Sequence, residues 1–145
     1  CPGLSLHFKS LLYELLYLCI SGYQLPESDR GGRFSDTERA RLIAVTDYVN
    51  AHYMEPVTLQ DAASVVALNP EYFCRFFRKN MGITFLEFVN QVRFSHVCRD
   101  ILHTDQSIME ILVRHGFTNY KLFRRMFHET YGCTPSAKRK EVSGR

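Results

Sequence analysis

Residues 73–84 read FCRFFRKNMGIT and residues 123–134 read FRRMFHETYGCT, so the pattern F-x-R-x-F-x4-G-x-T occurs twice, fifty positions apart. Upstream the match continues at an offset of forty-nine. The pairs there are Leu59 with Ile108, Asp61 with Glu110, Leu68 with Phe117, and Asn69 with Thr118. Self-similarity at a fixed spacing indicates one structural unit used twice.

Each copy of this unit reads as a helix-turn-helix. In the first copy Thr58 begins a short helix, and Asn69-Pro70 supplies an N-cap and a first-turn proline for a second helix that Gly82 ends. In the second copy Ser107 caps a helix over 108–114, and Thr118 caps a helix from 119 to about 131 after the turn 115–117. Two short helices joined by a tight turn predict helix-turn-helix units over about 58–82 and 107–132.

The segments around these units also read as helices. Ser35 and Glu38 have capping-box spacing ahead of a helix to about His52, and apolar residues over 85–103 predict a long linker helix between the two units. No alternating stretch is long enough for a strand, so the expected fold is all-α. The predicted helical domain spans 35–141.

An amphipathic helix is expected before this domain, over residues 4–22. Phe8, Leu11, Leu15 and Leu18 follow a 3-4-3 spacing, and residues 24–34 read as a polar linker. Either the helix packs on the remainder of this chain, or it ends a preceding domain (1–23) and pairs with a partner chain. The linker favours the second reading. Because the chain begins Cys1-Pro2 without an initiator Met, we expect a piece of a longer protein.

The composition is that of a globular protein, with 46% hydrophobic and 23% charged residues. The longest apolar stretch, 11–20, is too short to cross a bilayer, and five cysteines without a CxxC favour a reducing cytoplasm. Residues 36–106 carry 7 basic and 9 acidic residues, whereas 107–145 carry 8 and 3. The second copy is therefore electropositive, as a nucleic-acid surface requires, although the tail Lys138-Arg139-Lys140 reads as a solvated contributor.

The second helix of each unit is predicted to present a polar face that binds double-stranded DNA. Phenylalanines occupy the inward positions, while an arginine lies at the same outward position of both copies. Arginine can donate two parallel hydrogen bonds to guanine in the major groove. The candidate DNA-binding residues are Asn69, Glu71, Tyr72, Cys74, Arg75, Arg78, Asn119, Tyr120, Lys121, Arg124 and Arg125. A linker helix of about 27 Å can hold the two faces about one turn of DNA apart.

The chain resembles the AraC/XylS family of bacterial transcription regulators over about 36–141. The resemblance rests chiefly on Ser107-Ile108, Glu110-Ile111, Gly116-Phe117, Phe123, Arg125, Phe127, Gly132 and Thr134-Pro135, with weaker matches in the first unit. The resemblance implies a fold of two helix-turn-helix subdomains joined by a long helix. It also implies a protein that lies in the cytoplasm, associated with the nucleoid, and that activates transcription with RNA polymerase as its partner. It also implies an effector-binding domain upstream and homodimerisation through 4–22. Leu112, Val97 and Asp100 depart from the family pattern.

Two alternatives belong to other functional classes. Family relatives that carry a methyl-acceptor cysteine suggest DNA repair by Cys74 or Cys98, but neither has metal-ligand spacing. The acidic balance of residues 36–106 favours a module that binds polymerase with the first unit barely touching DNA. The expectation is a non-enzymatic regulator that holds no metal and no cofactor, since the six histidines form no HxxxH or HExxH motif.

Overall fold

The computed structural model describes residues 35–144. Its helices in this range are α2 (Asp36–His52), α3 (Leu59–Val65), α4 (Pro70–Met81), α5 (Phe85–His103), α6 (Ile108–Arg114), α7 (Tyr120–Tyr131) and α8 (Pro135–Ser143). No strand occurs among these residues, so the all-α prediction is confirmed for this part of the chain. The helix expected over 4–22 and the linker over 24–34 lie outside the described residues.

Local capping signals explain where the helices begin and end. The side chains of Ser35, Thr84 and Ser107 each accept from a backbone N–H three residues on, and the glutamate at that position reaches back to complete a capping box. Gly82 and Gly132 end α4 and α7 in the left-handed conformation, at φ 74° and 70°. These ends agree with the sequence prediction because they depend on residues within one turn.

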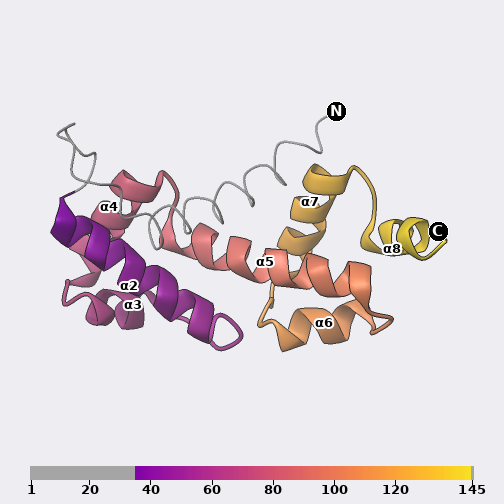
Figure 1. Cartoon of the computed structure of the whole chain (residues 1–145), viewed down its shortest axis with the longest axis horizontal. Helices are drawn as coiled ribbons and strands as arrows, with labels where there is room; N and C mark the ends of the chain where they lie inside the picture. Colours follow the sequence, from indigo (N-terminus) through magenta and orange to yellow (C-terminus); the bar gives the residue numbers. More distant parts are fainter. Residues whose placement is uncertain (1–34, 145) are drawn as a thin grey trace, which may run out of the picture.

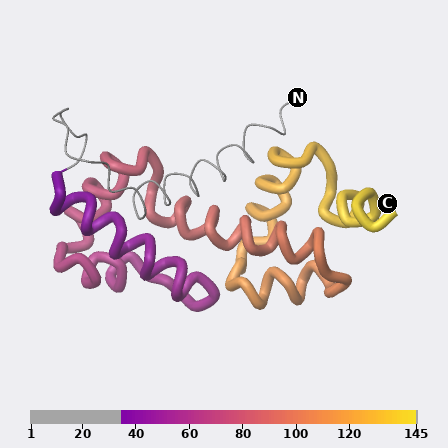
Figure 2. Tube along the Cα trace, viewed as in Figure 1, coloured from indigo at the N-terminus to yellow at the C-terminus, as the bar shows by residue number. Residues whose placement is uncertain are grey.

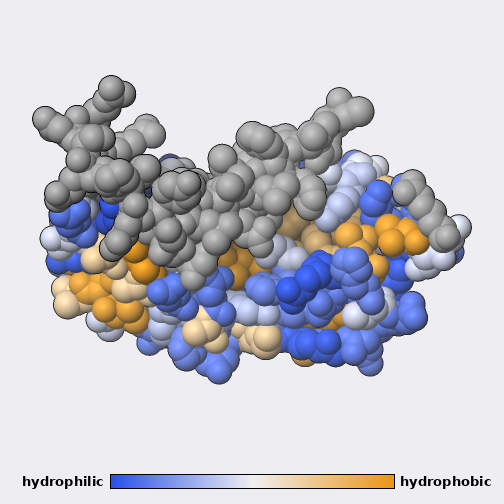
Figure 3. Space-filling model, viewed as in Figure 1, coloured by the Kyte–Doolittle hydropathy of each residue, from blue (hydrophilic) through white to orange (hydrophobic). Residues whose placement is uncertain are grey.

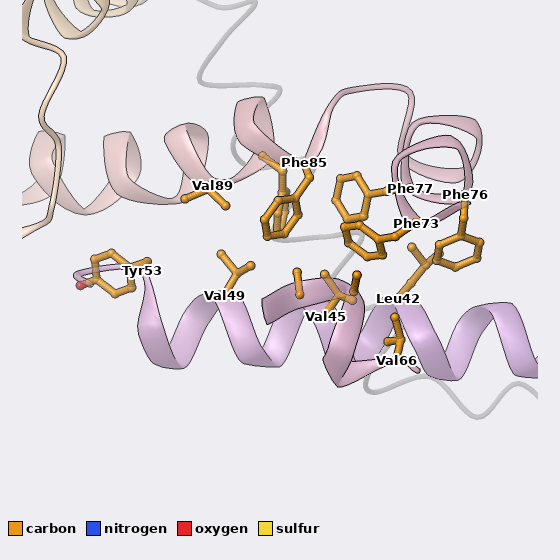
Figure 4. Packing of buried hydrophobic residues seen from close by; sticks show 13 residues of the cluster. Leu42, Val45, Val49, Tyr53, Val66, Phe73, Phe76, Phe77, Phe85 and Val89 are labelled. Atoms are coloured by element: carbon orange, nitrogen blue, oxygen red, sulfur yellow. The ribbon is translucent and has the colours of Figure 1, made fainter. Parts of the chain in front are cut away.

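The helix α5 takes part in two separate hydrophobic cores. Its first half contributes Phe85, Phe88 and Val89 to a core built with α2, α3 and α4. Figure 4 shows Phe73 and Phe77 of α4 facing Val45 and Val49 of α2 across this core. The second half of α5 contributes residues 94, 97, 98 and 101 to a core with α6 and α7. The chain thus forms two helix-turn-helix subdomains that share one helix (Figure 1).

The repeat extends beyond the helix-turn-helix units. Thr84 caps α5 and Thr134 caps α8, again fifty positions apart, and the residues that follow them, Phe85 and Pro135, are both buried. The prediction of a solvated basic tail is wrong for Arg139, whereas Lys140 is exposed as expected. Residues 138–140 belong to α8, and Arg139 Nε donates to the Ile101 carbonyl of α5 at 3.0 Å.

The predicted start of the second recognition helix also needs correction. Asn119, and not Thr118, is the N-cap of α7, because Asn119 Oδ1 accepts from the backbone N–H of Leu122 at 2.9 Å. The two caps Asn69 and Asn119 are thus fifty positions apart, while the turn residues Leu68 and Phe117 keep the offset of forty-nine. The second copy therefore has one extra residue, Thr118, in its turn.

Candidate nucleic-acid interface

The outward face of α4 carries the residues predicted for the first unit. Phe73, Phe76 and Phe77 are buried, while Glu71, Tyr72, Cys74, Arg75 and Arg78 are all exposed. The arginine of the repeated pattern, Arg75, forms no hydrogen bond or ion pair with any described residue. The face is therefore an open polar surface that contains two guanidinium groups.

The outward face of α7 is the counterpart in the second unit. Phe123 and Phe127 are fully buried, and Met126 is partly buried. The exposed residues are Tyr120, Lys121, Arg124, Arg125 and His128. Among the residues that the structure describes, none pairs with Lys121, Arg124 or Arg125. This face is more basic than that of α4, because Lys121 occupies the repeat position of Glu71.

Asn69 and Asn119 are helix N-caps, and this role limits the contacts that their side chains can make with DNA. Each side-chain oxygen accepts a backbone hydrogen bond at the start of its helix, Asn69 from Tyr72 at 2.8 Å and Asn119 from Leu122 at 2.9 Å. Reading adenine requires both the oxygen and the amide nitrogen of an asparagine. Because the cap holds the side chain in place and occupies one lone pair of the oxygen, the amide NH₂ is the freer group, and a phosphate oxygen is a matching acceptor for it.

The two recognition helices lie toward opposite ends of the shared helix. In Figure 1 α4 lies beyond the left end of α5, α7 lies above its right half and α6 lies below it, and the tube in Figure 2 follows the same path in the same view. The spacing of the two faces along DNA remains a prediction from the length of α5, which at 19 residues is about 28 Å long.

Sequence reasoning did not find the polar residues that join the two subdomains. Arg93 is buried in the middle of α5 and donates to the backbone carbonyls of Tyr53 and Glu55, both at 2.7 Å. His115, only 3% exposed, contacts Asp100 Oδ2 through Nε2 at 2.7 Å and Tyr53 Oη through Nδ1 at 3.3 Å. Arg93, His96 and Asp100 lie at i, i+3 and i+7 of α5, and this polar stripe was the available signal.

The departures from the family pattern have partners in this structure. Leu112 and Val97 are buried in the second core. Asp100 is paired with His115, Arg114 and Arg99. Burial by itself raises the pKa of Asp100, but the hydrogen bond from His115 and the charges of Arg99 and Arg114 outweigh it, so the pKa lies below its usual value. Figure 3 shows hydrophilic residues gathered over this end of α5 and over α6.

The cysteines do not share one environment. Cys74 is exposed on α4, Cys133 is partly buried, and Cys98 is buried beneath Tyr131. Burial raises the pKa of the Cys98 thiol to about 12, the opposite of what a nucleophilic cysteine requires. Residues 35–144 contain no group of three or more histidine, cysteine, aspartate and glutamate side chains that could hold a metal ion. Within the same range, no helix is long and apolar enough to traverse a lipid bilayer.

Comparison with known proteins agrees with this geometry. Residues 62–141 match the family described as helix-turn-helix domain. The regulatory protein PocR of Salmonella typhimurium is 32% identical over 120 residues, which cover 83% of this chain and 40% of PocR. The chain thus spans less than half the length of the curated relatives it matches.

Solved structures share the fold. A probable AraC family transcriptional regulator from Rhodopseudomonas palustris superposes with a TM-score of 0.65 at 20% identity, over 71% of this chain and 97% of that one. The DNA-binding domain of the global transcriptional factor AdpA, solved with a target DNA, gives a TM-score of 0.62 at 24% identity, over 77% and 96%. With its paired helix-turn-helix units and the match over more than half of its length, the chain belongs to the AraC/XylS family of helix-turn-helix transcription regulators.

Proposed function

We propose that this chain binds double-stranded DNA with α4 and α7, reads two successive major-groove segments, and thereby regulates bacterial transcription. One observation carries the proposal: the same exposed, arginine-bearing face recurs on the second helix of two consecutive helix-turn-helix units. Arg75 and Arg125 lie fifty positions apart, are both exposed, and have no partner among the described residues. A single charged helix face is usually solvated, but its recurrence at one repeat position favours a common ligand.

The start of α7 adds support from helix electrostatics. The N-terminus of a helix carries partial positive charge, so a lysine there opposes the helix dipole. The first turn of α7 contains no acidic residue, and Lys121 is exposed within it. A phosphate group near this turn would interact favourably with both the lysine and the dipole. The start of α4 differs, since Glu71 lies in its first turn, and we infer that the two helices read different bases.

Selection of bound sites from random duplex DNA tests the proposal. A two-unit reader should select sites that span two major-groove segments, and a footprint confined to one segment would favour the polymerase-binding module instead. Affinity should fall steeply with salt, because lysine and arginine contacts to phosphates release counterions. A flat salt response and no selected sequence would refute DNA recognition.

Arginine substitutions then identify which base position of the DNA site each arginine contacts. Arg75→Ala and Arg125→Ala should each cost about 1–3 kcal/mol and relax preference at one position of the site. Arg39 of α2 is a matched control, since it is exposed and lies outside both recognition helices. Arg39→Ala should leave base preference unchanged. If all three variants behave alike, the arginines contribute only general charge.

We also propose that this part of the chain has no methyl-acceptor or other catalytic activity. The support is the raised pKa of Cys98 and the position of Cys74 on an open helix face, with no metal-binding cluster among residues 35–144. Transfer of label from methylated DNA to either cysteine would refute this.

RNA polymerase as a partner in activation and homodimerisation through residues 4–22 are further proposals. We also propose that an effector binds upstream of this part of the chain and that the protein lies in the cytoplasm, associated with the nucleoid. They rest on the family and on the sequence pattern.

A further inference from the structure

The two subdomains touch at a short loop that follows α2. The aromatic ring of Tyr53 stacks on His96 of α5, with ring centroids 4.2 Å apart and an interplanar angle of 6°. Arg93 of α5 donates to the carbonyls of Tyr53 and Glu55. Between those two residues, the carbonyl oxygen of Met54 lies so close to Gly116 that an added Cβ would be 2.5 Å from it. The loop of the first subdomain thus contacts both the shared helix and the turn of the second.

A buried chain of hydrogen bonds crosses the same contact. Asp100 is acceptor-only as a carboxylate, so the short contact with His115 places a proton on Nε2. The other ring nitrogen, Nδ1, lies 3.3 Å from the hydroxyl of Tyr53 and forms a hydrogen bond with it. His115 therefore uses both ring nitrogens, one toward α5 and one toward the first subdomain. Because His115 is only 3% exposed, a ring nitrogen left without a hydrogen-bond partner would be costly. The two hydrogen bonds therefore favour one orientation of the His115 ring.

The other copy of the repeat shows that the turn itself does not require these residues. At the offset of forty-nine, Val66 corresponds to His115 and Ala67 corresponds to Gly116. Ala67 adopts a φ of 53°, close to the 67° of Gly116, so the turn forms with an alanine. The histidine and the glycine of the second unit are therefore explained by the contact with the loop 53–55 and not by the turn.

We propose that Tyr53, Arg93, Asp100 and His115 are positioning residues that hold α4 and α7 in one fixed register, so that the protein requires one spacing between its two DNA segments. This inference rests on the proposed function, because it concerns how two reading helices are coupled. One added base pair shifts the second segment by about 3.4 Å and rotates it by about 34–36°. A rigid pair of helices cannot follow that change, whereas a loosened pair can.

The test measures spacing tolerance in the intact chain. From the site obtained by selection, duplexes are made with one base pair inserted or removed between the two contacted segments, and dissociation constants are measured by fluorescence anisotropy. Two variants probe the contact. Tyr53→Phe removes one hydroxyl, and His115→Val introduces the residue that the first copy carries. Tyr48→Phe is the matched control, because Tyr48 lies on α2 and its ring contacts His52 on the same helix.

Wild type and Tyr48→Phe should lose at least about tenfold in affinity when the spacing changes, the loss that corresponds to about 1.4 kcal/mol. Tyr53→Phe and His115→Val should lose no more than about threefold, while their affinity for the best spacing changes little. Equal spacing penalties in all four proteins would overturn the inference, and so would a wild type indifferent to spacing. A wild type that binds no duplex would instead overturn the proposed function.

Because a valine at a buried histidine site can impair folding, Tyr53→Phe decides the outcome if His115→Val fails to fold. The hydroxyl is the smallest change that interrupts the chain between the subdomains. A merely structural role would lower the stability of the variant and leave the ratio of affinities between spacings unchanged.

Discussion

Replacement of Gly116 by alanine should destabilise the protein far more than the same replacement at the other two left-handed glycines. Gly82, Gly116 and Gly132 share nearly the same backbone conformation, with φ of 74°, 67° and 70°. Nothing lies within 4 Å of a Cβ added at Gly82 or Gly132, whereas at Gly116 the backbone of Met54 obstructs it. The three positions therefore separate conformational strain from steric contact.

The magnitude follows from these contacts. An L-residue in the left-handed region costs about 1–2 kcal/mol, and the lower chain entropy of unfolded alanine returns about 0.4–1 kcal/mol. Gly82→Ala and Gly132→Ala should thus lose about 0.5–1.5 kcal/mol. At Gly116 the loop 53–55 must also move, which weakens the two hydrogen bonds from Arg93. Such bonds contribute about 1.5–3 kcal/mol each, so Gly116→Ala should lose about 2–4 kcal/mol more than the controls.

Urea denaturation followed by far-ultraviolet circular dichroism measures the three unfolding free energies under one condition. Equal m-values would show that the variants expose the same amount of surface area on unfolding. A Gly116→Ala protein within about 0.5 kcal/mol of the two controls would contradict the close approach of Met54, given the precision of such measurements.

Three further predictions concern titratable and reactive side chains. Exposed Cys74 should react with iodoacetamide in the free protein and be protected by the selected duplex but not by a scrambled one, as peptide mass mapping would show; unchanged reactivity in a saturated complex would mean that α4 stays outside the groove. Because burial raises the pKa of Cys98 from about 9 to about 12, the unfolded thiol ionises first as pH rises. The stability of wild type relative to Cys98→Ala should therefore fall from pH 9 toward 12, by at most about 1.4 kcal/mol per pH unit, and a constant difference would contradict the burial. The pKa of Asp100 lies below its usual value of 3.8, so its contribution is present above that value and is lost as pH falls below it. Urea titrations from pH 6 to 2 should show the advantage of wild type over Asp100→Asn shrinking on acidification; an advantage that persists at pH 2 would exclude the carboxylate as its source.

The sequence predicted well those features that depend on neighbours along the chain. The capping boxes at Ser35 and Ser107 and the terminal glycines each act within one helical turn, so their signals are complete in the sequence. The burial of Phe73, Phe77, Phe123 and Phe127 followed from helical periodicity. All eleven candidate DNA-binding residues are exposed for the same reason, although their contacts with bases stay predictions.

The features that were missed depend on residues far apart in sequence. Arg139 is bonded to a carbonyl 38 positions away, so Lys138-Arg139-Lys140 resembled a free tail. Tyr53 and His115 are 62 positions apart, and no local pattern connects them. The choice between Thr118 and Asn119 as N-cap could not be made locally, since both are good caps. In the structure Asn119 is the N-cap, because its Oδ1 accepts from the backbone N–H of Leu122.

The sharing of α5 between two cores has a consequence for how the protein folds. Each core covers only about half of the helix, and an isolated helix shorter than about 12–15 residues is marginal in water. If one subdomain opened, its half of α5 would lose its packing and fray toward Arg93, which anchors the loop between the two. That fraying would also lower the stability of the subdomain that is still folded. Two cores that share no buried residue should therefore melt in a single transition, and neither unit excised alone would retain its full stability.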